Sequence, residues 1–203
     1  MSTGRIILAS SSPRRAALLR QIGLSPTIDP AAIDETLDAG DHTAPCEAVT
    51  RLARDKATTV AERHKGQHVA VIGADTVVCI DGEILGKPAD IGEAIAMLHR
   101  LSGQTHEVHT GVCVVSNATD RCFADVATTR VTMRQLDKGE IAAYVATGEP
   151  ADAAGAYAIQ GRAAVFVERI EGDYTNVVGL PLPLTERLLA QAGVEVALRW
   201  TRT

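Results

Sequence analysis

The stretch IILASSSPRRAALLRQIG, residues 6–23, joins an apolar run, a polar loop and an amphipathic segment that ends at glycine. Residues 6–9 are apolar and begin with two β-branched side chains, which predicts a buried strand. Residues 16–22 predict a helix that stops at the following glycine. Ser12 suits the N-cap of this helix and Pro13 its first position, where a missing N–H costs nothing. The stretch therefore predicts the strand, loop and capped helix with which an α/β fold begins.

Arg14 and Arg15 fall in the first turn of this predicted helix. A helix N-terminus carries partial positive charge and unpaired N–H donors, so two cations there are unfavourable by themselves. A bound polyphosphate reverses this, because the N–H groups, the helix dipole and both guanidinium groups then face anionic oxygens. The alternative is two surface arginines paired with nearby acids. The local sequence leaves both interpretations open.

Composition excludes several classes of protein. The chain has 203 residues, is 46% hydrophobic and 3% aromatic, and carries a net charge of −5. No apolar run of about 18 residues exists, and the N-terminus lacks the features of a signal peptide, so we expect a cytoplasmic protein that does not enter a membrane. An acidic, aromatic-poor chain is unsuited to nucleic acid. Cysteines 46, 79, 113 and 122 show no metal-site spacing and are expected to be buried thiols.

The rest of the chain alternates expected strands and helices without repeats, which predicts one α/β domain over residues 1–203. An acidic loop is expected at 29–44, a hairpin turn at Asp81-Gly82, and a capping box at Asp90 and Glu93. The expected strands are 69–78, 83–85, 106–116, 121–133 and 164–170, and the expected helices are 45–64, 91–101, 137–147 and 184–192.

Asp75 follows the apolar run VAVI of residues 69–72, where a carboxylate is poorly solvated unless something pairs with it. It could be a helix cap or turn former, a metal ligand, or a base that activates water. Asp34 and Glu35 in the acidic loop could complete a divalent-metal site with it. Open α/β sheets bind ligands beyond the carboxyl ends of their strands, which points to residues 10–15 and 73–76.

Three other patterns give weaker signals. Lys87 in GEILGKP (82–88) lacks the spacing and the Ser/Thr of a phosphate-binding loop. HEVH (106–109) falls in an expected strand, where residues three apart face opposite ways, so it is no zinc motif. The serines at 10–12 lack the flanking glycines of a nucleophile elbow, so they do not indicate a serine hydrolase. In segment 144–161, small residues with Tyr157 and Gln160 could shape a pocket for a nucleobase.

Seven stretches of the chain carry a family resemblance when they are taken together. They are LASSSPRR (8–15), RLARDKA (51–57), GADTVV (73–78), LGKP (85–88), LSGQTHEVHTGV (101–112), GEPADAAGAYAIQG (148–161) and GDYTNVVGLPL (172–182). In this order they resemble the Maf family of septum-formation-inhibitor-like nucleotide pyrophosphatases. The resemblance implies hydrolysis of nucleoside triphosphates to the monophosphate and pyrophosphate with a divalent metal (Mg, Mn or Co). It also implies a homodimer and a bilobed domain, in which a mixed, twisted sheet is flanked by helices and the active cleft lies between the lobes.

The resemblance also implies roles for individual residues. Arg14, Thr76 and Gln160 match the branch of the family that acts on dTTP and UTP rather than on 7-methyl-GTP. Asp75 matches the general base, and it is also a candidate metal ligand together with Glu35. The residues expected to bind phosphate are Ser12, Arg15, Lys56 and Lys87.

Two functions follow from these observations. In the first, the chain is an enzyme in which Asp75 activates water for attack at the α-phosphorus and pyrophosphate leaves. In the second, it is a nucleotide-binding regulator of cell division whose hydrolysis is incidental. A carboxylate beside a phosphate clamp favours the enzyme, because a pure binding site gains little from an added anion.

Overall fold

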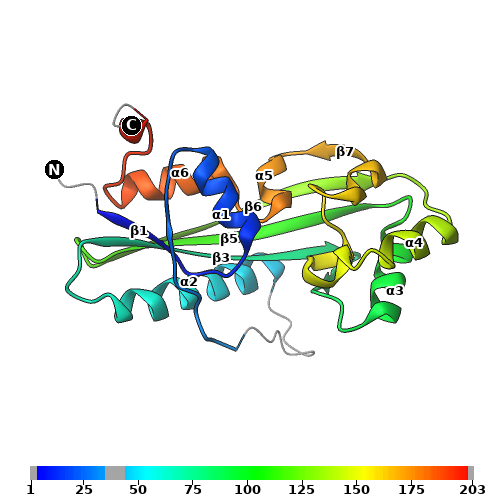
Figure 1. Cartoon of the computed structure of the whole chain (residues 1–203), viewed down its shortest axis with the longest axis horizontal. Helices are drawn as coiled ribbons and strands as arrows, with labels where there is room; N and C mark the ends of the chain where they lie inside the picture. Colours follow the sequence, from blue (N-terminus) through cyan, green and yellow to red (C-terminus); the bar gives the residue numbers. More distant parts are fainter. Residues whose placement is uncertain (1–3, 35–43, 201–203) are drawn as a thin grey trace. The chain divides into compact units, whose positions relative to one another are not determined.

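The computed structural model describes residues 4–34 and 44–200, apart from the side chain of Arg199. Figure 1 shows a sheet with helices, and short 3₁₀ helices occur between α4 and β7 and after α6. The strands are β1 (Arg5–Leu8), β2 (Thr27–Ile28), β3 (Val69–Ile80), β4 (Glu83–Leu85), β5 (Thr105–Ser116), β6 (Arg121–Met133) and β7 (Val167–Glu171). The helices are α1 (Pro13–Gln21), α2 (Pro45–Arg63), α3 (Ile91–Leu101), α4 (Lys138–Val145), α5 (Tyr174–Val178) and α6 (Leu182–Gln191).

The strands form one seven-stranded sheet in the order β2-β1-β3-β5-β6-β7, with β4 paired to β3. β1 runs parallel to β2 and β3, whereas β4 is antiparallel to β3 and β7 antiparallel to β6. The expectation of an α/β fold with a mixed sheet flanked by helices is therefore confirmed.

The chain divides into two compact units, and β3, β5 and β6 each supply residues to both. Unit 1 comprises residues 1–75, 110–127 and 179–203, and unit 2 comprises residues 76–109 and 128–178. The expected single domain with a cleft between two lobes stays a prediction.

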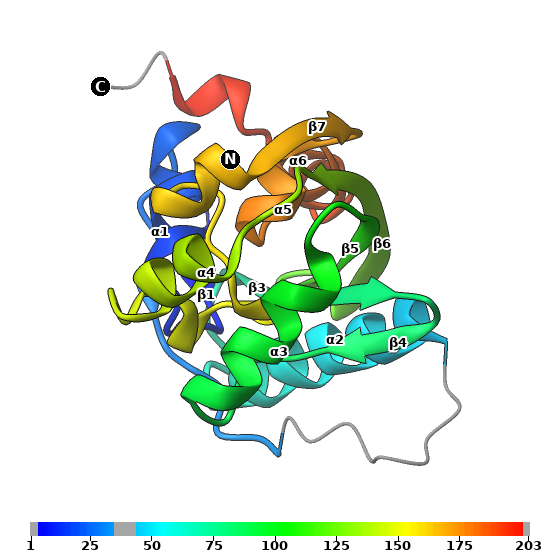
Figure 2. The same cartoon turned by 90° about the vertical axis from the view of Figure 1, so that its right-hand side faces the viewer.

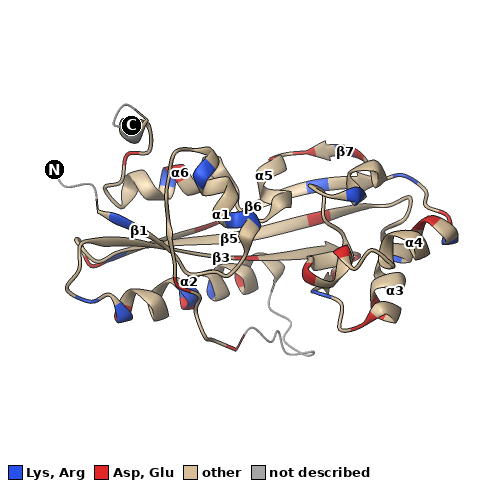
Figure 3. Cartoon of the chain, viewed as in Figure 1, with Lys and Arg blue, Asp and Glu red and all other residues tan. Residues whose placement is uncertain are grey.

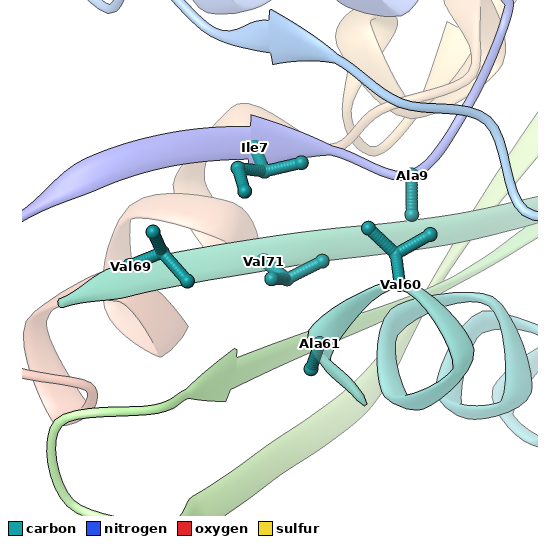
Figure 4. Close-up of a cluster of buried hydrophobic side chains, with 6 residues drawn as sticks. All are labelled: Ile7, Ala9, Val60, Ala61, Val69 and Val71. Atoms are coloured by element: carbon teal, nitrogen blue, oxygen red, sulfur yellow. The ribbon is translucent and has the colours of Figure 1, made fainter. Parts of the chain in front are cut away.

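The core of unit 1 forms where β1 and β3 pack against α2. Figure 4 shows side chains of β1 and β3 pointing toward the last turns of α2. They are small or branched, so the helix and the strands can approach closely. Helix α2 lies on one face of these strands, and α1 and α6 lie on the other (Figure 1). The cluster consists of Ile7, Ala9, Val60, Ala61, Val69 and Val71.

Two glycines let α2 touch the sheet directly. A Cβ added at Gly73 in β3 would lie 2.2 Å from the Ala53 carbonyl oxygen, and one at Gly111 in β5 would lie 2.3 Å from the Val49 carbonyl oxygen. Carbon and oxygen cannot approach this closely without a shift of the backbone. The two glycines therefore set the distance between α2 and the strands beneath it.

In unit 2, α3 lies beside α4 (Figure 2). The Asp137 side chain accepts from the Glu140 N–H, and the Glu140 carboxylate accepts from the Asp137 N–H, so α4 carries a complete capping box. At α3 the Asp90 side chain accepts from the Glu93 N–H at 2.8 Å, as expected. The Glu93 carboxylate, however, accepts from the Ala89 N–H rather than from Asp90, so the predicted reciprocal box is wrong in that half.

The expected strands and helices are present within three residues of their expected ends, including the short strand 83–85, whereas two other short elements were not predicted. The β3–β4 turn has positive φ at Asp81 and Gly82, the geometry of the tightest hairpin turns. Sequence periodicity did not predict β2 or α5, which have two and five residues. Residues 162–166 form a 3₁₀ turn, so β7 begins three residues later than the expected strand.

The cysteines depart in part from the expected burial. Cys79 and Cys113 are buried, but Cys46 is half-buried and Cys122 is exposed, so the prediction of four buried thiols is wrong for these two. Cys122 lies on β6 next to the β5–β6 turn, with its Sγ 3.1 Å from Cys113 Sγ. Among the described residues, no helix is long and apolar enough to cross a membrane.

Candidate active site

The first part of the site is the loop that joins β1 to α1. Ser12 caps α1, since its Oγ accepts a hydrogen bond from the Arg15 N–H at 3.4 Å, and Pro13 opens the helix. The predicted strand, loop and capped helix are thus confirmed. Figure 3 shows basic residues at the start of α1. Arg14 and Arg15 are half-buried there, beside backbone N–H groups that a helix N-terminus leaves unpaired.

Arg15 also has a role in holding this loop. Its Nε donates to the Gly179 carbonyl oxygen at 2.8 Å, and its Nη1 donates to Ser10 Oγ at 3.2 Å. Ser10 is buried, and its Oγ also accepts from the Ser12 N–H at 3.2 Å. The Arg15 guanidinium is therefore tied to the end of β1 and to the segment that precedes α6, in addition to any part it has in binding an anion.

The second part is an ion pair inside unit 1. Lys56 Nζ donates to Asp75 Oδ1 at 2.7 Å, and the two side chains are only 5% and 11% exposed. In residues 4–34 and 44–200, no hydrogen bond to Asp75 Oδ2 is found. One carboxylate oxygen is thus fixed by the ammonium group, and the other is available to a water molecule or a cation.

Asp75 lies inside a strand, which corrects one alternative. β3 continues without interruption from residue 69 to residue 80, so Asp75 caps no helix and forms no turn. The parallel pairing of β1 with β3 ends at Leu8 and Ile72, where the Ala9 N–H still donates to the Ile72 carbonyl. Beyond that point the loop from Ser10 leaves the sheet while β3 continues toward Asp75. The loop and the carboxylate therefore both follow the end of one parallel ladder, as the rule for open α/β sheets predicts.

Sequence reasoning did not foresee the pairing of Lys56 with Asp75, although a signal existed. Residues 49, 52, 53, 57 and 60 form the apolar face of α2, and position 56 falls on that same face. A lysine there must be buried and needs a partner, because an unpaired charge in a core is costly. The partner comes from a different element, and helical periodicity contains no information about it.

Three further predicted site residues, Thr76, Lys87 and Gln160, lie in unit 2. Thr76 directly follows Asp75 and is half-buried. Lys87 is exposed and forms an ion pair with Asp152, which is also exposed. Gln160 is exposed, and among the described residues no hydrogen bond to its side-chain amide is found. Glu35, the remaining predicted metal ligand, lies outside the described residues.

The two histidines of HEVH, His106 and His109, have separate hydrogen-bond partners. His106 Nε2 lies 2.8 Å from the Tyr157 hydroxyl, and His109 Nδ1 lies 2.9 Å from Thr128 Oγ1. Burial lowers the pKa of His106 to about 4 and raises that of Tyr157, so both are uncharged near neutral pH. Burial also lowers the pKa of His109, and this outweighs the opposing effect of Glu107.

The described residues contain no group of three His, Cys, Asp or Glu side chains that could hold a metal ion. Mg²⁺ differs from zinc in that it usually retains several waters and binds one or two carboxylates together with substrate phosphates. Asp75 Oδ2 is one carboxylate oxygen that could take part in that mode of binding.

Comparisons with known proteins show which family and which named proteins the chain is similar to. A family model described as Maf-like protein matches residues 5–192. A protein named dTTP/UTP pyrophosphatase from Methylobacillus flagellatus is 50% identical over 95% of this chain and 94% of its own. Proteins of the same name from Geobacter sulfurreducens and Myxococcus xanthus are 50% and 49% identical, over 90% and 96% of this chain and 93% and 95% of theirs.

One solved structure is also similar over most of its length. It is described as a nucleoside-triphosphatase / dITP/XTP pyrophosphatase from Mycobacterium abscessus, is 16% identical, and covers 93% of this chain and 97% of its own with a TM-score of 0.44.

Proposed function

The chain belongs to the Maf-like protein family, and from this premise we propose that it hydrolyses dTTP and UTP to the nucleoside monophosphate and pyrophosphate. The names of three relatives at 49–50% identity support this substrate class, because each alignment covers at least nine-tenths of both chains. The structural observation that carries the proposal is the buried pair of Lys56 and Asp75.

Asp75 is proposed as the general base. Lys56 holds Oδ1 and thereby fixes the plane of the carboxylate, while Oδ2 accepts a proton from a water molecule. The oxygen of that water attacks the α-phosphorus. The bond from this phosphorus to the bridging oxygen breaks, and pyrophosphate leaves with the bonding electrons.

The start of α1 is proposed to bind the phosphates. Ser12, Arg14 and Arg15 lie in a turn where backbone N–H groups and the helix dipole also favour an anion. Lys87 is assigned to the same triphosphate. Its ion pair with Asp152 is exposed and thus weak, so a phosphate group can replace the carboxylate.

A divalent cation is proposed to accompany the triphosphate, held by Asp75 and Glu35 and completed by phosphate oxygens and water. When bound, such an ion neutralises charge on the phosphate oxygens. Mg, Mn and Co all remain candidates for it.

Base selection is assigned to Gln160 together with Thr76 and Arg14. Uracil and thymine present an O4 acceptor and an N3–H donor, and a side-chain amide offers one donor and one acceptor that match them. Cytosine inverts both groups, and each polar group left unpaired in a closed site costs about 1–3 kcal/mol. We further propose that residues 1–203 act as one domain and that the protein is cytoplasmic. We also propose that it is a homodimer, and light scattering tests this oligomeric state.

Hydrolysis of UTP in ¹⁸O-labelled water tests the reaction. Attack at the α-phosphorus places the label in UMP and leaves the pyrophosphate unlabelled. Label in orthophosphate, with UDP as the second product, would refute the proposal. Absence of turnover with each of the three candidate metals would favour a nucleotide-binding protein instead of an enzyme.

A further inference from the structure

The short turn that carries Gln160 is fixed by hydrogen bonds on both sides. The Ala158 N–H donates to the Tyr144 hydroxyl oxygen at 3.1 Å, and the Arg162 N–H donates to Glu149 Oε2 at 3.2 Å. Between these two points, the Gly161 N–H donates to the Ala158 carbonyl at 2.9 Å and closes the turn. The main chain around Gln160 is therefore held by two side chains that lie earlier in the sequence.

Tyr144 and Glu149 are themselves joined. The Tyr144 hydroxyl donates to Glu149 Oε1 at 3.0 Å while it accepts from Ala158. Tyr144 lies on α4, is 4% exposed, and packs edge-on against Phe166 with the ring centroids 5.2 Å apart. Glu149 has an exposed side-chain fraction of 18%. A buried ring thus supports a partly buried carboxylate, and both bond to the Gln160 turn.

The Glu149 carboxylate also lies directly against Gly161. A Cβ added at Gly161 would lie 2.2 Å from Glu149 Oε1 and 2.6 Å from Oε2. A side chain at this position would force the Glu149 carboxylate to shift, although φ is negative and by itself tolerates other residues. The residue after Gln160 therefore lies directly against the carboxylate.

The opposite end of the segment has separate anchors. The Tyr157 hydroxyl lies 2.8 Å from His106 Nε2, and the Gly155 N–H donates to the Gly86 carbonyl at 3.0 Å. These contacts hold the residues before Ala158. The turn around Gln160 is instead held by the hydrogen bonds from Ala158 to Tyr144 and from Arg162 to Glu149.

In contrast to its main chain, the Gln160 side chain is exposed, and no partner holds its amide within the part of the chain that the structure describes. No neighbour among these residues fixes which end of the amide faces the base. Its place is set only by the backbone from which it extends.

We propose that Glu149 and Tyr144 are positioning residues for base selection, because they hold the turn from which Gln160 presents its amide. This inference rests on the proposed role of Gln160 as the residue that recognises the base. Neither residue needs to touch the nucleotide. Their loss lets the turn shift, so the amide no longer stands at the position from which it meets the base.

The test compares Glu149→Gln and Tyr144→Phe with wild type on UTP and CTP. Glu149→Gln retains the size of the side chain but replaces one acceptor oxygen by an NH₂ group that must face a donor, either the Tyr144 hydroxyl or the Arg162 N–H. Tyr144→Phe leaves the Ala158 N–H without its acceptor. We expect the ratio of kcat/KM for UTP to that for CTP to fall about tenfold or more in each, since small misplacements at a site have large effects.

A purely structural role would lower activity on both nucleotides by one factor and leave their ratio unchanged, which would overturn the proposal. Glu168→Gln is the matched control, because Glu168 is an exposed carboxylate on β7 in the same unit. Melting temperatures verify that each variant folds. If Glu149→Gln fails to fold, Tyr144→Phe, which removes one oxygen atom, decides the test.

Gln160→Ala separates this inference from the function on which it depends. If Gln160→Ala lowers the ratio but Glu149→Gln and Tyr144→Phe do not, Gln160 remains the residue that recognises the base and the positioning role is refuted. If Gln160→Ala leaves the ratio unchanged, recognition by Gln160 is refuted, and so is any role that Glu149 exerts through it. A lower ratio in all three variants supports both.

Discussion

Gly73 is the position at which a single added methyl group should disturb the Lys56–Asp75 ion pair, the proposed catalytic centre. A Cβ there would lie 2.2 Å from the Ala53 carbonyl oxygen and 2.7 Å from the Ala57 backbone nitrogen, both on α2. Helix α2 must retreat by about 1 Å before these contacts reach ordinary van der Waals separation. Lys56 lies on this same turn of α2, and its 2.7 Å contact with Asp75 would then exceed hydrogen-bond length.

Gly73→Ala should therefore lower both stability and turnover. Overpacking of this kind costs about 1–3 kcal/mol, which for a chain of this length lowers the melting temperature by about 2–12 °C. Displacement of a catalytic group by about 1 Å can cost about 10²-fold in rate, so kcat for UTP should fall by a factor of that order. Thermal denaturation and a pyrophosphate-release assay measure the two effects.

Gly86→Ala is the matched control for this prediction. Nothing lies within 4 Å of an added Cβ at Gly86, and its φ is not positive, so its stability should change little. An unchanged melting temperature in Gly73→Ala would refute the close packing of α2 on β3. A lower melting temperature with normal kcat would refute the dependence of catalysis on the Lys56–Asp75 distance.

Three further variants test separate parts of the site. Asp75→Asn should lower kcat by about 10²–10⁴-fold while calorimetry still detects UTP binding. It should also destabilise the fold by up to about 3–5 kcal/mol, because the buried Lys56 ammonium loses its anion. Near-normal turnover would exclude Asp75 as the base. Arg15→Ala should lower turnover. It should also lower the free energy of unfolding by about 1–3 kcal/mol, because the hydrogen bonds of Arg15 to Gly179 and Ser10 are lost. An unchanged stability would show that these hydrogen bonds contribute nothing. The pKa of His106 is about 4 in the folded chain and near 6.5 in the unfolded chain. Between these pH values the unfolded chain binds more protons than the folded chain. The free energy of unfolding should therefore decline as the pH falls from about 6.5 to 4. His106→Asn should reduce that slope in melting experiments, and an identical slope would assign it to other groups.

The sequence by itself determined the elements whose causes are local. Ser12 and Pro13 are sufficient to start α1, because a cap and a proline act on the turn in which they stand. Asp81-Gly82 is sufficient to form the β3–β4 hairpin, because both residues tolerate positive φ. The alternation of such elements made the mixed α/β sheet predictable.

Within the site, sequence pattern and family resemblance identified Asp75, the arginines of α1 and Gln160 as candidates but did not give their surroundings. A turn-forming Asp75 is one interpretation of the sequence, because a polar step breaks an apolar run, although the expected strand 69–78 already contains this residue. The structure shows that β3 runs through Asp75 without interruption. Similarly, the position of Lys56 on the apolar face of α2 indicates that it needs a partner, but not which one.

Tertiary structure decided those contacts because they join residues that periodicity does not relate. Gly73 allows α2 to rest closely on β3, and across this contact Lys56 meets Asp75. Gln160 is held in place by Tyr144 and Glu149, which lie more than ten residues earlier, through hydrogen bonds to its neighbours rather than to itself. Propensity and capping act within a few residues along the chain, whereas close packing and the pairing of buried polar groups act between elements and depend on the distances that the fold creates.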